Sequence, residues 1–113
     1  MHELSVTQGI LDMAIEKALE AGSKRVTDIY LVIGDASSII DDCVQFSFDF
    51  VSKDTIAEGA RLHFQRIPLQ VRCRDCGDVF RPQKESWECP QCKKWEVDII
   101  KGKEFYMESI EVD

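Results

Sequence analysis

The stretch "CRDCGDVFRPQKESWECPQC", residues 73–92, decides the fold of this 113-residue chain because it holds two closely spaced cysteine pairs. Cys73 and Cys76 form the first pair, and Cys89 and Cys92 form the second. Two residues between cysteines let both sulfurs of a pair reach one ion from a tight turn, and the intervening loop returns the second pair to the same place. The sequence therefore predicts a tetrahedral site of four thiolates for one metal ion.

The expected role of this metal is structural. Four protein thiolates leave no open position for water or substrate, which is the pattern of a structural site rather than a catalytic one. Zinc is the favoured ion, and iron in a rubredoxin-like site, which uses the same ligands, is an alternative. A redox-active dithiol pair also stays open, although a single CxxC pair would suffice for it. Residues 70–95 hold few aliphatic side chains, so we expect the folding energy of this module to come largely from the metal.

The turns after the two pairs differ in one respect. Gly77 follows the first pair, where a left-handed backbone is expected and glycine adopts it at no steric cost. Lys93 stands at the corresponding place after the second pair, which departs from the usual glycine. The pattern of this module still indicates two metal-binding turns.

A zinc ribbon that binds nucleic acid or a transcription protein is the main competing interpretation. Six basic residues against four acidic ones in residues 69–95 are a slight excess, and the whole chain carries a net charge of −7. Nucleic-acid binding depends on neutralising phosphates with a basic surface, so the charge balance argues against it. The basic residues concerned are Arg72, Arg74, Arg81, Lys84, Lys93 and Lys94.

The first sixty residues read as a helix, a strand and an ambiguous segment. "SVTQ" at residues 5–8 fits a capping box, apolar residues then recur at helical spacing, and Gly22 fits a C-cap, so a helix is expected over residues 5–21. "RVTDIYLVI" at residues 25–33 predicts a buried strand. In the ambiguous segment that follows this strand, Phe46, Phe48 and Phe50 alternate with polar residues, which favours a second strand. The apolar positions of the expected helix are Leu11, Ala14, Ile15, Ala18 and Leu19.

Two further strands are expected on either side of the cysteine module. Ala60, Leu62 and Phe64 alternate with polar residues up to Pro68, and "EFYMESIEV" at residues 104–112 reads as a last strand that rejoins the first sheet. The alternation puts His63 on the polar face, where a solvated histidine is expected. The order of elements indicates an α/β sandwich with a metal-stapled module inserted before the final strand.

Composition narrows the class of protein. A pI near 4.8, no run of eighteen apolar residues and no secretory leader indicate a cytoplasmic protein that binds neither nucleic acid nor membranes as its main activity. No Ser/His/Asp arrangement, phosphate loop or open metal shell stands out, so we expect no enzyme.

The fifth cysteine, Cys43, stands alone in an apolar run and is expected to be a buried, inert thiol.

The opening residues Met1, His2 and Glu3 form a possible chelate. Methionine ahead of a bulky residue is expected to be retained, so its α-amine is free. That amine and the His2 amide nitrogen close a five-membered ring on a metal ion, the imidazole Nδ1 closes a six-membered ring, and the amide or carboxylate of Glu3 offers a fourth donor. Tetragonal nitrogen and oxygen donors suit Ni(II) or Cu(II). A histidine at position 2 is more often only a terminal residue, and termini are often mobile.

These features together resemble one family across essentially the whole chain. The opening "MHELS", "VIGDAS" at residues 32–37, "AEGARL" at residues 57–62 and the two CxxC pairs are similar to those of the HypA/HybF family of hydrogenase maturation nickel metallochaperones. The combination of a Met-His-Glu start with a downstream four-cysteine motif is more specific than either part alone.

The resemblance implies an α+β fold. Two helices on a three-stranded sheet would form a nickel-binding domain over residues 1–68 and 103–113, and a small zinc-ribbon-like domain over residues 69–102 would be inserted in it. It also implies a helix over residues 38–52, against the strand pattern of the phenylalanines.

The same resemblance implies the metals and partners. Met1, His2 and Glu3 would bind Ni(II), and Cys73, Cys76, Cys89 and Cys92 would hold structural zinc. Asp41 lies where some members place a further acidic residue near the nickel. The expected partners are the GTPase HypB and the large subunit of nickel–iron hydrogenase and, in some organisms, urease accessory proteins.

Overall fold

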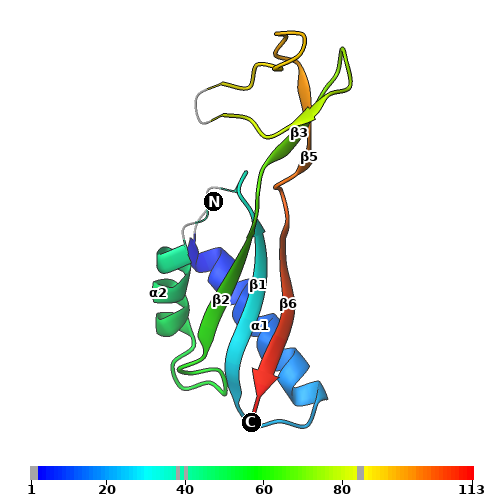
Figure 1. Ribbon diagram of the computed structural model, residues 1–113. Helices are drawn as coiled ribbons and strands as arrows, with labels where there is room; N and C mark the ends of the chain where they lie inside the picture. Colours follow the sequence, from blue (N-terminus) through cyan, green and yellow to red (C-terminus); the bar gives the residue numbers. More distant parts are fainter. Residues whose placement is uncertain (1–2, 38, 40, 84–85) are drawn as a thin grey trace. The chain divides into compact units, whose positions relative to one another are not determined.

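The computed structural model describes residues 3–37, 39, 41–83 and 86–113, and the chain divides into two compact units. The helical unit comprises Met1–Val32, Ile39–Gln65 and Tyr106–Asp113. The cysteine unit comprises Ile33–Ser38 and Arg66–Phe105. Figure 1 labels both helices and all strands of the two units except β4.

Helix α1 spans Glu3–Glu20 in the helical unit. Its start lies two residues ahead of the expected one, so Ser5 is inside the helix and the predicted capping box is wrong. The C-terminal prediction is confirmed: Gly22 has φ 71°, and the Ser23 N–H donates to the Ala18 carbonyl at 2.9 Å. Among the described residues, no helix has the length and apolarity that a membrane span needs.

The buried face of α1 differs from the predicted one at its edges. Leu19 is 62% exposed and Ile15 only half-buried, because the row of fully buried positions at this end of the helix is that of Ala14 and Ala18, one residue earlier in each turn. The first turn of this face holds Thr7, whose hydroxyl donates to the Leu4 carbonyl at 2.9 Å and is thereby satisfied. The buried residues of α1 are Val6, Thr7, Ile10, Leu11, Ala14 and Ala18.

A three-stranded sheet of order β2-β1-β6 confirms the predicted strands on both sides of the cysteine module. Its strands are β1 (Val26–Gly34), β2 (Arg61–Ile67) and β6 (Phe105–Val112). Figure 1 shows β1 and β2 running in one direction, β6 running in the other, and α1 crossing one face of the sheet. The connection from β1 to β2 passes through α2, as a parallel pair requires.

Helix α2 spans Asp41–Val51 and packs against α1. The strand expected from the alternating phenylalanines is therefore wrong, and the helix implied by the family resemblance is confirmed. Phe48 is fully buried, together with Val44 one turn earlier, whereas Phe46 and Phe50 are 78% and 66% exposed. The prediction for Cys43 is also wrong, because this thiol is exposed.

The cysteine unit contains a second three-stranded sheet, of order β4-β3-β5, which the sequence analysis did not predict. Both pairings are antiparallel, and Val71 lies opposite Phe80 on one side and Ile99 on the other. The buried side chains described in this unit are Ile33, Val71, Cys73 and Cys89. Half of this small core is therefore made of cysteine. The strands are β3 (Gln70–Cys73), β4 (Val79–Phe80) and β5 (Val97–Lys101).

Two glycines of the cysteine unit touch where its chain segments cross. A Cβ on Gly34 would lie 2.0 Å from the carbonyl carbon and oxygen of Gly102, so only glycine fits there. Gly102 is buried and has φ 111°, a conformation that glycine alone adopts readily. The Gly34 N–H donates to the Glu104 carbonyl at 2.7 Å, and the Ala36 N–H donates to the Gly102 carbonyl at 2.7 Å.

Candidate metal centre

Four cysteine sulfurs converge at one point of the cysteine unit. The Sγ atoms of Cys73, Cys76, Cys89 and Cys92 all lie within 4.8 Å of one another. The closest contacts join the two pairs, at 3.4 Å between Cys73 and Cys92 and 3.5 Å between Cys76 and Cys89. A tetrahedral zinc site with bonds of about 2.3 Å has sulfur–sulfur edges of about 3.8 Å. The sulfur cluster therefore fits a single ion of this kind, and all four cysteines are free thiols.

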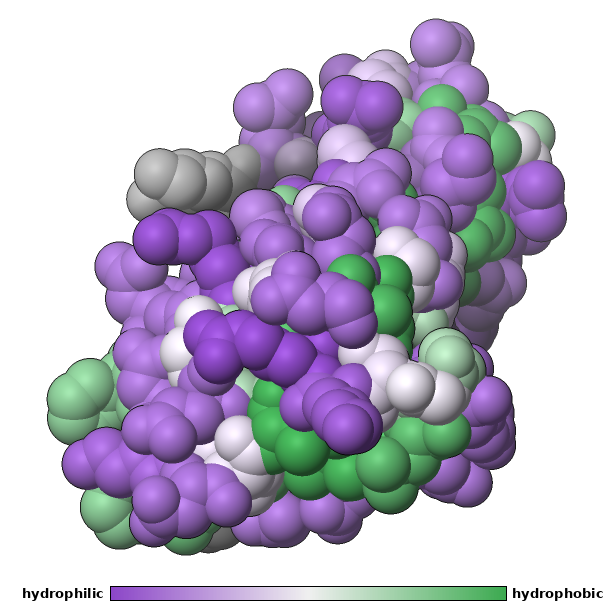
Figure 2. Space-filling view, turned by 90° about the horizontal axis from the view of Figure 1, so that it is seen from below, coloured by the Kyte–Doolittle hydropathy of each residue, from purple (hydrophilic) through white to green (hydrophobic). Residues whose placement is uncertain are grey.

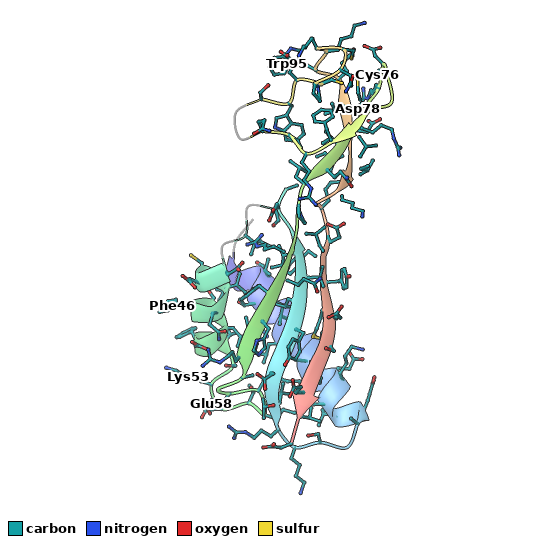
Figure 3. All side chains as sticks on the ribbon, viewed as in Figure 1. Phe46, Lys53, Glu58, Cys76, Asp78 and Trp95 are labelled. Atoms are coloured by element: carbon teal, nitrogen blue, oxygen red, sulfur yellow. The ribbon has the colours of Figure 1, made fainter. Side chains whose placement is uncertain are left out.

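The two cysteine pairs adopt the same backbone turn. In the first, the Cys73 N–H donates to the Asp78 carbonyl at 2.8 Å, and the Gly77 N–H donates to the Cys73 carbonyl at 3.0 Å. In the second, the N–H of Cys89 donates to the Lys94 carbonyl at 2.8 Å, and the Lys93 N–H donates to the Cys89 carbonyl at 2.9 Å. Figure 3 shows Cys76 and Asp78 close together in the first turn.

The conformation of these turns explains the residues that follow each pair. Gly77 has φ 77°, and Lys93, at the equivalent place, has φ 66°. A left-handed conformation costs a residue with a Cβ roughly 1–2 kcal/mol. The second turn keeps this geometry despite the lysine, as expected if its two sulfurs are held by a common ion.

The clustered sulfurs affect one another's ionisation. Hydrogen bonds from the backbone at Cys76 and Asp75 lower the pKa of Cys73 to about 7, against the opposing effect of burial. A backbone hydrogen bond from Asp78 also lowers the pKa of Cys76, but burial and the neighbouring sulfurs outweigh it and raise the pKa to about 12. Without a cation, one thiolate thus forms at the expense of another, and a dication removes this conflict by stabilising all four.

Ion pairs occupy two of the basic residues near the cluster. Lys94 Nζ lies 3.1 Å from Asp75 Oδ2, which joins the second turn to the first. Arg74 Nη2 lies 2.9 Å from Asp98 Oδ1, which joins the first turn to β5. Neither pair was expected from the sequence, because each joins residues that are distant along the chain. The slight basic excess of this module is thereby partly neutralised.

The other predicted site residues lie in the helical unit. Met1 and His2 are outside the described residues, so the structure does not place them. Glu3 is the first residue of α1, and Asp41 is a half-buried residue that opens α2. Figure 1 shows the first turns of both helices at the same end of this unit.

His63 differs from the solvated histidine that the sequence suggested. Its Nε2 lies 2.7 Å from Asp28 Oδ1, and its ring stacks on Tyr30 with 4.5 Å between ring centroids. The Tyr30 hydroxyl in turn donates a hydrogen bond to the Glu111 carboxylate. This polar cluster joins all three strands of the sheet and engages the second histidine of the chain, the first being His2.

The fold and the sulfur cluster together define a small α+β protein in which a four-cysteine metal-binding module is inserted before the last strand of a helix-packed sheet. Residues 1–112 match the model of the family described as "Hydrogenase/urease nickel incorporation, metallochaperone, hypA". The chain belongs to this HypA family. It is accordingly a maturation factor of the metallochaperone class and not an enzyme.

Curated relatives agree with this assignment, and solved structures agree with the fold. The chain is 45% identical to hydrogenase maturation factor HypA of Dehalococcoides mccartyi strain 195, over all of this chain and 95% of that protein. It is 46% identical to HypA of Caldanaerobacter subterraneus, with both chains fully covered. The solution structure of a HypA protein matches with a TM-score of 0.73 at 24% identity, over 99% of this chain and 96% of that one. The structure of the nickel metallochaperone HypA from Helicobacter pylori gives 0.66 at 23% identity, over 99% and 97%.

Proposed function

We propose that this protein binds Ni(II) at its N-terminus through Met1, His2 and Glu3 and delivers it for the maturation of nickel–iron hydrogenase. The observation that carries the proposal is the family match, which begins at residue 1 and therefore includes the Met-His-Glu start. Nickel incorporation is the activity named for that family. Urease is a second recipient to be tested.

The start of α1 suits such a chelate. The first four N–H groups of a helix have no acceptor within the helix. Since α1 begins at Glu3, the amide nitrogens of His2 and Glu3 can bind a metal without breaking a helical hydrogen bond. A chelate at a chain end has few ligands to release, which favours transfer of the ion to a recipient. Asp41 is a further candidate near this site, as an acid that opens the neighbouring helix.

We assign the second metal, zinc, a structural role at Cys73, Cys76, Cys89 and Cys92. The sulfur distances and the closed ligand set support zinc held permanently. The helical unit and the ends of its sheet would then form the nickel-binding domain, over residues 1–68 and 103–113, and residues 69–102 would form the zinc domain. The protein would retain one metal ion and transfer the other.

The proposed partners are the GTPase HypB and the large subunit of nickel–iron hydrogenase, in the cytoplasm. A net charge of −7 favours association with partners that present basic surfaces. The competing function is a zinc-ribbon adaptor that binds nucleic acid or a transcription protein. The ion pairs of Arg74 and Lys94 with carboxylates count against that alternative. It predicts salt-dependent oligonucleotide binding and no stoichiometric nickel binding.

Metal analysis of the purified protein tests the proposal. We expect one tightly held zinc per chain and, after nickel is added, one exchangeable nickel per chain. A variant with one extra residue ahead of Met1 should lose the nickel and keep the zinc, because the α-amine moves away from His2. Equal nickel binding by the extended chain would rule out the N-terminal chelate.

A further inference from the structure

Helix α2 (Asp41–Val51) exposes two large aromatic side chains on the side that faces away from the core. Phe46 is 78% exposed and Phe50 66% exposed, while Phe48, between them in sequence, is fully buried. Figure 3 shows Phe46 pointing away from the sheet, and Figure 2 shows that hydrophilic residues cover most of the face seen there. Contiguous exposed apolar patches rimmed by polar residues mark interaction sites, whereas single exposed apolar residues are common on protein surfaces.

The exposed apolar residues of α2 have the spacing of a docking helix. Cys43, Phe46 and Phe50 are all exposed and follow one another at intervals of i, i+3 and i+7. Residues at this spacing lie on one helix face and serve as anchors when an amphipathic helix enters an apolar groove. Helix α2 therefore has two apolar faces, one buried by Val44 and Phe48 and one facing solvent.

The charged residues within α2 itself are all acidic. The helix contains Asp41, Asp42 and Asp49 and no basic residue. Asp42 and Asp49 are both exposed, and they lie seven residues apart, beside the apolar stripe. Lys53 follows the helix, with its Nζ 5.8 Å from the centre of the Phe50 ring. A complementary surface would therefore combine an apolar groove with a basic rim.

We propose that the stripe Cys43–Phe46–Phe50 docks into an apolar groove rimmed by lysine or arginine on a partner protein. The two phenylalanines fill the groove, and Asp42 and Asp49 pair with the basic rim. Charge complementarity selects this occupant over a second copy of the chain. In a self-association through α2, the aspartates of one copy would face those of the other, which costs binding energy.

The test measures binding of two probes, the purified GTPase HypB and the hydrogenase large subunit, which are the partners named in the proposed function. Phe46→Gln and Phe50→Gln replace each anchor with a better helix former, so the fold should hold, as checked by zinc content and circular dichroism. The matched control is Leu19→Gln on α1, since Leu19 is 62% exposed and lies outside the stripe. A double charge reversal, Asp42→Lys with Asp49→Lys, tests the rim.

We expect one of the two probes to bind the wild-type chain. Each phenylalanine variant should weaken that binding at least tenfold, by analogy with aromatic hot spots at protein interfaces, and the Leu19 control should leave it unchanged. The charge reversal should weaken binding and reverse its dependence on salt, because lysines opposite a basic rim repel it and salt screens that repulsion. No binding of either probe, equal loss in the Leu19 control, or unchanged binding in both phenylalanine variants would overturn the proposal.

Two further readouts separate this inference from its alternatives. Sedimentation of the isolated protein should show a monomer, or a dimer that Phe46→Gln leaves intact. A dimer dissolved by that substitution would identify a second copy as the occupant and contradict the proposal. Nickel binding should be the same in all variants, because the stripe contains no proposed nickel ligand. If the wild-type chain bound the partner but no nickel, the proposed function would be refuted and the docking proposal would stand.

Discussion

Removal of the metal should unfold the cysteine unit and leave the helical unit folded. The cysteine unit has a small core, since only four described side chains are buried in it and two of these are Cys73 and Cys89. A structural zinc contributes about 10 kcal/mol or more to folding, which is comparable to the whole stability of a small domain, about 5–15 kcal/mol. The helical unit has its own core, built from α1, α2 and β1, including the fully buried Phe48 and Ile29.

Hydrogen exchange at single amides is the appropriate assay, because the hydrogen bonds of each unit are known. After the metal is stripped with a chelator, the amides of Cys73 and Cys89, which bond to Asp78 and Lys94, should exchange as in an unfolded peptide. The amide of Val26, which donates to the Ile56 carbonyl in the helical unit, should stay protected. Protection of the cysteine amides in fully metal-free protein would refute the reasoning.

A pair of serine variants provides the matched control. Cys73→Ser removes a buried cysteine of the sulfur cluster and should give the same exchange pattern as the chelator. Cys43→Ser removes the exposed cysteine of α2 and should retain one zinc and full protection. Loss of zinc in the Cys43 variant would mean that the ligand set has been misassigned.

Three further predictions concern stability and ionisation. Gly34→Ala should lower the free energy of unfolding, measured in urea, by about 3 kcal/mol, because its Cβ would lie 2.0 Å from the Gly102 carbonyl and a hydrogen bond would be lost. Its control, Gly9→Ala, has no atom within 4 Å of the new Cβ and should raise the free energy of unfolding by about 1 kcal/mol. Similar effects of the two substitutions would contradict the packing described at Gly34. Lys93→Gly should stabilise the cysteine unit by up to about 1 kcal/mol, because glycine adopts the left-handed conformation of Lys93 (φ 66°) without strain. Zinc-competition or hydrogen-exchange measurements check this, and a comparable loss of stability would argue against strain at this residue. The hydrogen bond from His63 holds the pKa of Asp28 below its usual 3.8. This interaction therefore stabilises the fold above about pH 4, and its contribution is lost as the pH falls through the lowered pKa. NMR of the Asp28 carboxyl group should show its pKa rising towards 3.8 in His63→Ala, and an unchanged pKa would exclude His63 as the cause.

The sequence predicted most elements of the helical unit because their patterns are local. The C-cap glycine Gly22, apolar spacing and alternation indicated α1, β1, β2 and β6 within about two residues. Helix α2 was misread because Phe46 and Phe50 are exposed, and their presence beside the buried Phe48 mimics the alternation of a strand. Only the family resemblance gave the helix. Residues that break the pattern of their own element are often functional, which agrees with the docking proposed for this stripe.

The cysteine site was predictable by spacing and its surroundings were not. The convergence of the four cysteines follows from the CxxC pairs. Strands β4 and β3 have only two and four residues, too short for a periodic signal. The contacts of Asp75 with Lys94 and of His63 with Asp28 join residues far apart along the chain. Such pairs depend on the tertiary fold, and no local pattern in the sequence reports them.

The central claim, a nickel site that depends on the second residue, is tested most directly by nickel titration of two alanine variants. The chain has two histidines, so His63→Ala, which removes the ring beside Asp28 and Tyr30, is the matched control for His2→Ala. We predict that His2→Ala abolishes stoichiometric Ni(II) binding while zinc content and fold are unchanged, and that His63→Ala binds nickel like the wild type. Unchanged nickel affinity in a folded His2→Ala variant would contradict the account.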